Sequence, residues 1–216
     1  MKISPLHYYR LWREPWRKVF WTAYYKYRAD KMEARRMDLS FLQSGDTVLD
    51  FGGFEGAWAE HAYAHNHPEI HIFEPHPVFA ADIEKRFAGR DKVHCHTMAL
   101  GSADGTLELS DDGDASSSHV SAGSAVSGKI RKAGDFLSQI EPPVALAKIN
   151  IEGGEYDLLP ALEQAGWLQH IKVLQIQFHL YSEADIARRD EIRRSLAQTH
   201  DCDWDYPFVW EQWTLR

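Results

Sequence analysis

The chain has 216 residues, 44% of them hydrophobic, and its 24 Lys and Arg side chains are outnumbered by 32 Asp and Glu, giving a net charge of −8. That length predicts a single core-forming unit, and the negative charge argues against a nucleic-acid substrate held by neutralising its phosphates. Only Cys95 and Cys202 occur, far apart in the sequence. This usage is typical of a reducing cytosol rather than a disulfide scaffold.

Residues 1–40 form a basic, aromatic N-terminal extension of a main domain at 41–216. The sequence predicts a helix over 15–37, with Trp16, Phe20, Tyr24 and Tyr27 on one face. That face could pack on the domain, lie on a membrane surface or dock a protein, and the pattern leaves these alternatives open. No segment approaches 18 apolar residues, and the N-terminus lacks the apolar core of a signal peptide. We therefore expect a cytoplasmic protein, with peripheral contact at the inner membrane face as one alternative.

The stretch 47–56, TVLDFGGFEG, predicts a buried strand that ends in Asp50 and breaks into a glycine-rich turn before a helix. The glycines of the turn are Gly52, Gly53 and Gly56. Their spacing differs from the Gly-x-Gly-x-x-Gly of dinucleotide-binding turns, and Asp50 and Glu55 would place carboxylates beside a diphosphate. A cationic ligand such as S-adenosylmethionine, which carries a sulfonium and an ammonium group, fits better. A turn that binds no ligand is the alternative.

The remaining elements alternate along the chain. Expected strands are 70–74, 92–96, a hairpin of 98–100 with 106–109, then 145–151, 173–178 and a terminal hairpin within 204–215 that turns near Pro207. Expected helices are 57–66, 78–87, 135–140, 155–165 and one running from Ser182 toward Thr199. The polar, glycine-rich stretch 110–128 is expected to be a mobile loop, functional or simply disordered. Alternating strands and helices predict an α/β fold with a mostly parallel sheet, helices on both faces and a C-terminal antiparallel hairpin.

Polar residues end four of the apolar strands: Asp50, Glu74, Asn150 and His179. The carboxyl ends of strands are where ligands bind in open α/β sheets, so these four predict a site. Glu74 stands 22 positions beyond Gly52, near the spacing at which an acid reaches a ribose diol.

With these residues in hand, the chain resembles the FkbM family of methyltransferases from about Asp46 through the C-terminal tail. The motifs that carry the resemblance are VLDFGGFEG, IFEP, MALGSADGTLEL, KINIEGGEYDLL and QIQFH, in this order. The resemblance implies the class I (Rossmann-like) methyltransferase fold, S-adenosylmethionine as cofactor, and O-methylation of a hydroxyl on a sugar of a glycan or sugar nucleotide. A natural-product hydroxyl is the alternative substrate.

The resemblance also assigns roles to individual residues. Asp50, Gly52, Gly53 and Gly56 would wrap the methionine end of the cofactor, Glu74 would bind its ribose hydroxyls, and Met98 and Ala99 would lie near the adenine. Asn150 and Glu155 are candidates for binding the substrate. The family commonly has Asp where this chain has Asn150, which removes a hard oxygen ligand, so we expect no divalent metal there.

Methyl transfer to an alcohol needs in-line placement of the nucleophile and a base that removes one proton. The first candidate is His179, with an apparent pKa expected between about 6 and 7.5. Glu152 and Lys148 are the other catalytic candidates, although Lys148 could instead form a buried ion pair with Glu152 or Glu155. His61, His65 and His67 lack the cysteines or second histidine pair that a structural zinc site needs.

Two other classes of function remain as alternatives. One is a dinucleotide-dependent oxidoreductase, which the glycine spacing disfavours. The other is a non-catalytic protein that keeps the fold and serves as a scaffold for glycan-assembly enzymes.

Overall fold

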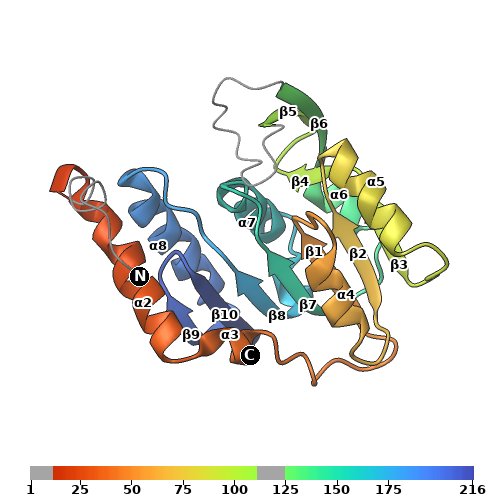
Figure 1. Cartoon of the computed structure of the whole chain (residues 1–216), viewed down its shortest axis with the longest axis horizontal. Helices are drawn as coiled ribbons and strands as arrows, with labels where there is room; N and C mark the ends of the chain where they lie inside the picture. The colour runs from red at the N-terminus through yellow and green to blue at the C-terminus, as the bar shows by residue number, and fades with distance from the viewer. Residues whose placement is uncertain (1–11, 111–124) are drawn as a thin grey trace.

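The computed structural model describes residues 12–110 and 125–216, and its main feature is one seven-stranded sheet (Figure 1). The strands are β1 (Thr47–Phe51), β2 (Glu69–Phe73), β3 (Val93–His96), β7 (Val144–Ile149), β8 (Ile171–Ile176), β9 (His200–Tyr206) and β10 (Trp210–Leu215). Their order across the sheet is β3-β2-β1-β7-β8-β10-β9. The first five pair in parallel, whereas β10 runs antiparallel to both of its neighbours. The predicted parallel sheet and the C-terminal hairpin are both confirmed.

Helices cover both faces of this sheet, as the alternating pattern predicts. They are α4 (Ala57–Tyr63), α5 (Pro77–Arg86), α6 (Ala133–Leu137), α7 (Glu155–Gln164) and α8 (Ala184–Leu196), with a short 3-10 turn η2 (Leu168–His170). α4 and α5 bury their apolar side chains against Val48 and Ile70 on one face. α6, α7 and α8 pack against Leu49 and Leu174 on the other. All six residues of β7 are buried, as expected of a central parallel strand covered on both sides.

A second, three-stranded sheet corrects one prediction. It contains β4 (Ala99–Gly101), β5 (Gly105–Ser110) and β6 (Ala125–Lys132), in the order β4-β6-β5. β4 and β5 do not form the hairpin expected from 98–100 and 106–109, because β6 lies between them and pairs with both. The end of the stretch expected as a loop, 125–128, belongs to β6, and its residues 111–124 lie outside the described part of the chain.

The N-terminal segment is also more broken than predicted. In place of one helix over 15–37 there are η1 (Pro15–Arg17), α2 (Lys18–Ala29) and α3 (Met32–Arg36). The break falls at Lys31, which has a left-handed backbone (φ 55°) that a continuous helix cannot contain.

α2 lies alongside β9 of the C-terminal hairpin (Figure 1). Its aromatic side chains Phe20, Tyr24 and Tyr27 pack in one cluster with aromatic residues of the hairpin. The ring of Tyr27 meets that of Tyr206 edge-on at 5.3 Å, and the Tyr206 hydroxyl donates a hydrogen bond to Asp30 at the end of the helix. The Arg36 guanidinium lies 4.3 Å from the Trp210 ring. α2 therefore packs on the domain, which was the first of the alternatives left open by the sequence. Among residues 12–110 and 125–216, no helix is both long and apolar enough to cross a bilayer.

Candidate active site

An ion pair joins the carboxyl ends of the two central strands, β1 and β7. Asp50 and Lys148 are direct neighbours in the register of these strands. Lys148 Nζ lies 2.9 Å from Asp50 Oδ1 and donates a second hydrogen bond of 2.7 Å to the carbonyl oxygen of Gly52. Both side chains are buried, with exposed fractions of 0% for Asp50 and 6% for Lys148. The expected buried ion pair of Lys148 is present, but its partner is Asp50 and not Glu152 or Glu155.

The pair leaves acceptor capacity unused at the same place. Within the described residues, neither Asp50 Oδ2 nor the side-chain oxygen Oδ1 of Asn150 has a hydrogen-bond donor, although both atoms are buried. Burial raises the pKa of Asp50, while the neighbouring Lys148 ammonium lowers it. A buried acceptor without a donor costs roughly 1–3 kcal/mol, and such costs are usually explained by a function or by an absent ligand or water.

The glycines of the turn have a packing role of their own. Gly52 has a left-handed backbone (φ +85°), and a Cβ atom added there would lie 2.0 Å from the backbone oxygen of Asn150. A Cβ at Gly53 would lie 2.3 Å from the side chain of Ile72. Gly56, also left-handed (φ +78°), precedes α4. The close approach of β1 to β7 and β2 therefore requires glycine at 52 and 53, independently of any ligand.

Glu74 ties the end of β2 to this turn. Its Oε2 accepts a 2.8 Å hydrogen bond from the backbone N–H of Phe54, and its Oε1 accepts one of 2.8 Å from that of His76. The residue is 5% exposed, and burial raises the pKa of its carboxyl. Each carboxylate oxygen has a second acceptor site, so Glu74 can still accept hydrogen bonds from a diol.

Met98 and Ala99 lie beside the same strand end. The backbone N–H groups of Glu74 and Met98 converge on the carbonyl oxygen of His96, at 3.1 Å and 2.7 Å. Ala99 begins β4 immediately afterwards. The predicted adenine-side residues are thereby held next to Glu74.

His179 lies just beyond β8, between two carboxylates. Its backbone N–H donates to Glu155 Oε1 at 2.7 Å, and its ring Nδ1 lies 3.2 Å from the same oxygen. The other ring nitrogen, Nε2, lies 3.6 Å from Glu152 Oε1. Glu155 is completely buried, and its second oxygen accepts from the backbone N–H of Gly153 at 2.9 Å. Glu155 therefore orients His179 and the loop that follows β7, and both of its oxygens are engaged by the chain itself.

The surroundings of His179 change its expected protonation. Burial lowers the pKa of His179, but the interactions with Glu152 and Glu155 outweigh that effect and raise it to about 9. The expected pKa between about 6 and 7.5 is therefore wrong, since two neighbouring carboxylates favour the charged imidazolium. At pH 7 the ring is protonated, and it acts as a base only after losing that proton.

Tyr181 and Tyr156 also belong to this cluster, and neither was predicted from the sequence. The Tyr181 hydroxyl donates to Glu152 Oε2 at 3.0 Å, and its ring stacks on His179 with a centroid distance of 6.0 Å. The Tyr156 hydroxyl donates to the backbone oxygen of His179 at 2.7 Å. A signal for Tyr181 was available, because it follows a strand-end histidine by two residues. Tyr156 gave no such signal, because it lies at the start of an ordinary predicted helix.

Seven of the predicted site residues thus form two neighbouring groups linked by the loop after β7. The first contains Asp50, Gly52, Lys148 and Asn150, and the second contains Glu152, Glu155 and His179. That loop is unusual in its backbone, since Glu152 has φ 51° and Gly153 has φ 100°. A non-glycine residue held in the left-handed region is costly and is found preferentially at functional sites.

Solved structures with the same architecture include three that span most of this chain. A protein from Clostridium thermocellum, proposed to be an rRNA methylase, has a TM-score of 0.55 at 10% identity, covering 84% of this chain and 94% of its own. A protein from Staphylococcus aureus, proposed to be a caffeoyl-CoA O-methyltransferase, has a TM-score of 0.53 at 6% identity, covering 86% and 81%. A third, from Streptococcus mutans, is proposed to be a methyltransferase and was crystallised with SAH; its TM-score is 0.50 at 9% identity, covering 85% and 97%.

No protein-family model matches the chain, and no curated protein matches it in sequence. At these low identities the similarity to solved structures establishes the class I methyltransferase fold and says nothing about the substrate.

Proposed function

We propose that this protein is an S-adenosylmethionine-dependent O-methyltransferase. The observation that carries the proposal is a pair of buried acceptors, Asp50 Oδ2 and Asn150 Oδ1, at the carboxyl ends of the two central strands, for which the described part of the chain supplies no donor. Unused acceptors at this position suit a ligand that brings N–H donors, as the ammonium group of S-adenosylmethionine does. The pyrophosphate of a dinucleotide brings only acceptors, which disfavours the oxidoreductase alternative.

The cofactor residues follow from this arrangement. Asp50 and Asn150 would accept from the ammonium group, and the backbone of the turn Gly52, Gly53 and Gly56 would lie along the methionine chain. Lys148 already balances the charge of Asp50, so it is a support of the cofactor site more than a catalytic group. Glu74 accepts from the ribose hydroxyls through its remaining lone pairs. Met98 and Ala99 flank the adenine.

The base in this proposal is His179. Nδ1 faces Glu155, whereas Nε2 is 3.6 Å from Glu152, too long for a good hydrogen bond, and so remains able to meet a substrate hydroxyl. Bound S-adenosylmethionine would supply the methyl group, its carbon–sulfur bond breaking as the hydroxyl oxygen bonds to the methyl carbon, and would leave as S-adenosylhomocysteine. The neutral Nε2 of His179 would accept the hydroxyl proton. Glu152 orients the ring and, with Asn150, contacts further substrate hydroxyls.

A sugar hydroxyl in a glycan or sugar nucleotide is the proposed acceptor, on the strength of the FkbM-like motifs KINIEGGEYDLL and QIQFH. A natural-product hydroxyl and a non-catalytic scaffold remain the alternatives.

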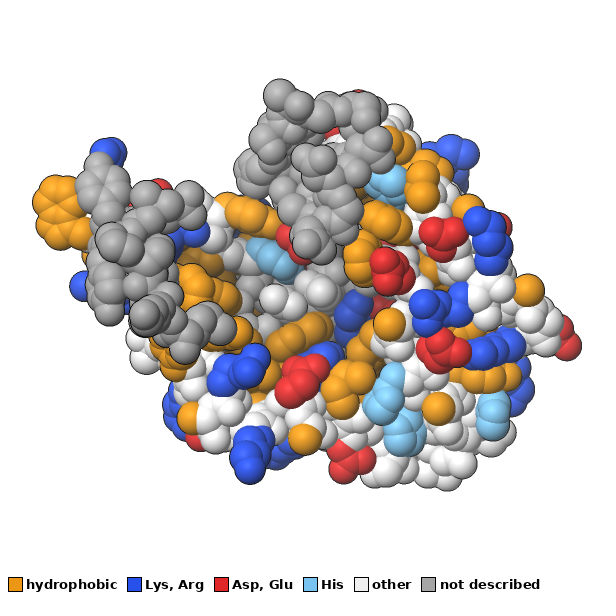
Figure 2. All heavy atoms as spheres, in the orientation of Figure 1, with side chains coloured by type: hydrophobic (Ala, Val, Ile, Leu, Met, Phe, Trp, Pro, Cys, Tyr) orange, Lys and Arg blue, Asp and Glu red, His pale blue; other side chains and the backbone are white. Residues whose placement is uncertain are grey.

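The charge of the chain supports a substrate other than nucleic acid. The net charge is −8, and in the view of Figure 2 the described acidic and basic side chains are interspersed rather than gathered by sign. Some structural neighbours are described as rRNA methylases, but a fold shared at 10% identity does not transfer their substrate.

The location of the protein rests on sequence features alone. We propose that it is cytoplasmic, from its cysteine usage, and that residues 1–40 are an extension of the domain at 41–216. The aromatic face of α2 is occupied by the C-terminal hairpin, so contact of the extension with the inner membrane face or a partner protein would use its other residues.

The test is transfer of a labelled methyl group from S-adenosylmethionine to separate panels of sugar nucleotides, glycans, phenolic natural products and ribosomal RNA. We expect label in a sugar panel, retained after exhaustive chelation, and transfer slowed by about 10²-fold or more with the His179→Ala variant. Label only in RNA would overturn the proposed substrate class. Tight binding of the cofactor without transfer to any panel would favour the scaffold.

A further inference from the structure

A cluster of histidines on the edge of the sheet lies away from the site described above. β2 supplies Glu69 and His71, and β3 supplies His94 and His96, each pair two residues apart. Alternate residues of a strand point to the same face, and the register places His71 directly beside His94. These four side chains therefore share one face of the edge pair of strands.

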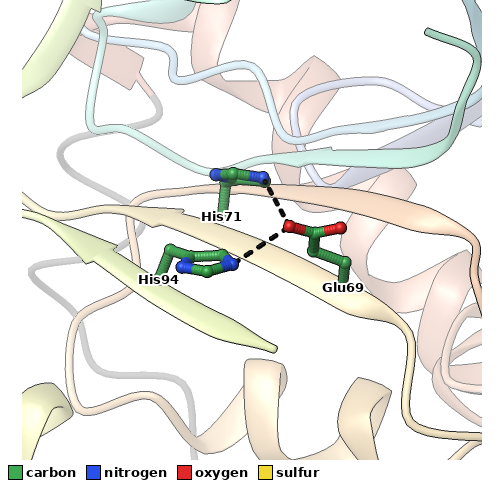
Figure 3. A group of neighbouring side chains, drawn as sticks. All are labelled: Glu69, His71 and His94. Atoms are coloured by element: carbon green, nitrogen blue, oxygen red, sulfur yellow. Dashed lines mark hydrogen bonds and ion pairs between the residues drawn. The ribbon is translucent and has the colours of Figure 1, made fainter. Parts of the chain in front are cut away.

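Three of the four converge on one point (Figure 3). Glu69 Oε1 lies 3.1 Å from His94 Nε2 and 3.8 Å from His71 Nε2. One ligand atom from each of Glu69, His71 and His94 can be chosen so that all three lie within 4.8 Å of one another. A tetrahedral zinc ion with bonds of about 2.1 Å holds its ligand atoms about 3.4 Å apart. Small rotations of the half-exposed Glu69 and His94 side chains would close the set.

The fourth residue, His96, supports the first three. Its Nε2 lies 3.0 Å from His71 Nδ1, and its ring packs against Phe73 and Phe136, each with a centroid distance of 4.9 Å. A metal-binding histidine usually donates its other N–H to a fixed acceptor, which sets the tautomer. If His71 Nδ1–H donates to His96, the lone pair of His71 Nε2 is directed toward Glu69 and His94.

A simple surface hydrogen bond explains only part of this geometry. The 3.1 Å contact of His94 with Glu69 is an ordinary hydrogen bond. His71 Nε2, at 3.8 Å, is too far to share that bond, yet it points to the same oxygen, and the His71 side chain is only 14% exposed. A common ion accounts for both orientations.

We propose that Glu69, His71 and His94 bind one divalent transition-metal ion of the zinc type, with His96 as a positioning residue and water in the fourth position. Glu69 is the first residue of β2, so the ion would lie toward the amino ends of the strands, at the opposite end from Glu74. It would fasten the edge strand β3 to β2 and take no part in methyl transfer. The sequence drew attention only to His61, His65 and His67. A set formed by two strands becomes visible only when the pairing register of β2 and β3 is known.

The experiment is a calorimetric titration of the tag-free full chain with Zn²⁺, with Co²⁺ absorption as a report on tetrahedral ligation. The variants are His94→Ala and His96→Phe. The matched control is His65→Ala, which disrupts the other neighbouring histidine pair, whose rings are 5.0 Å apart on and beside α4.

We expect one ion per chain, with binding lost in His94→Ala, weakened about 10–100-fold in His96→Phe and unchanged in His65→Ala. Zn²⁺ should raise the melting temperature of the wild type and of His65→Ala but not of His94→Ala. Circular dichroism confirms that each variant is folded. Binding that survives in His94→Ala, or that is lost in His65→Ala, would overturn the proposal.

Discussion

Two buried carboxylates in this molecule, Glu211 and Asp50, differ in how many of their oxygens accept a hydrogen bond. On the C-terminal hairpin, Glu211 accepts from Trp213 Nε1 through Oε1, at 3.0 Å, and from Arg189 and Arg193 through Oε2. At the centre of the sheet, Asp50 accepts from Lys148 through Oδ1 alone, and its Oδ2 has no donor among the described residues. Both carboxylates are essentially inaccessible to solvent.

The difference separates a structural cluster from a binding site. Each oxygen of Glu211 has a donor from the chain, so this carboxylate needs no further donor and fastens α8 to the hairpin, although Arg189 Nε is buried without an acceptor among the described residues. The Asp50 cluster is incomplete at the place where α/β folds bind ligands. An incomplete buried network is costly unless a ligand supplies what it lacks. Substitutions in and around the two clusters should therefore distinguish a structural role from a ligand-binding role.

The largest effect should come from removing a buried carboxylate. Asp50→Asn leaves the Lys148 ammonium buried without a counter-charge and should lower the free energy of unfolding by about 3–5 kcal/mol. Glu211→Gln removes the buried one of the two carboxylates that pair with Arg189 and Arg193 but leaves Asp205, so its loss of stability should be smaller. Urea denaturation measures both. Added S-adenosylhomocysteine should then stabilise Glu211→Gln, as it does the wild type, but not Asp50→Asn. Equal stabilisation of both variants would erase the distinction between the clusters.

The next effect concerns the base. His179→Ala should reduce the rate of the chemical step by about 10²-fold or more, the usual share of general-base catalysis. The wild-type rate should rise with pH through an apparent pKa of about 9, because His179 must first lose its proton. Single-turnover measurements with the cofactor already bound separate the rate from binding. A near-normal rate in His179→Ala would transfer the role to Glu152.

A somewhat smaller effect is expected at the glycine turn. Gly52→Ala forces a Cβ atom to within 2.0 Å of the Asn150 carbonyl oxygen on a left-handed backbone, so stability should fall by more than about 2 kcal/mol and cofactor binding should be lost. Gly45→Ala is the matched control, since Gly45 is also left-handed (φ +100°) but a Cβ there meets nothing within 4 Å. Thermal denaturation with and without S-adenosylhomocysteine compares them. Similar losses of stability and cofactor binding in both variants would show that the left-handed backbone, and not the contact with Asn150, causes the effect.

The smallest effect should be a change in pH dependence. Glu152 helps to raise the pKa of His179, so Glu152→Gln should move the apparent pKa of the rate downward, toward that of an ordinary imidazole. The same change should reduce the loss of stability as pH rises, because a raised histidine pKa stabilises the fold below about 6.5 and ceases to do so above about 9. An unchanged or higher apparent pKa would show that Glu152 does not face the imidazolium.

Local patterns in the sequence were enough to predict the main sheet and the strand-end residues. The glycine turn, Glu74 and His179 stand out because apolar runs stop at them. What could not be predicted depends on pairing between distant segments. β6 separates β4 from β5, Lys148 meets Asp50 across two strands, and two carboxylates raise the pKa of His179. These contacts join residues far apart in the chain. A single sequence does not show which residues of two strands lie opposite each other.

The most direct test of the central claim is calorimetric titration of the wild type and of Asn150→Leu with S-adenosylhomocysteine, and of the wild type with NAD. Leucine keeps the size of Asn150 but removes the acceptor that lacks a donor. We predict one site for S-adenosylhomocysteine in the wild type, affinity at least about tenfold weaker in Asn150→Leu, as expected for a lost hydrogen bond to a charged group, and no binding of NAD. Binding of NAD in place of S-adenosylhomocysteine, or full affinity in Asn150→Leu, would contradict the account.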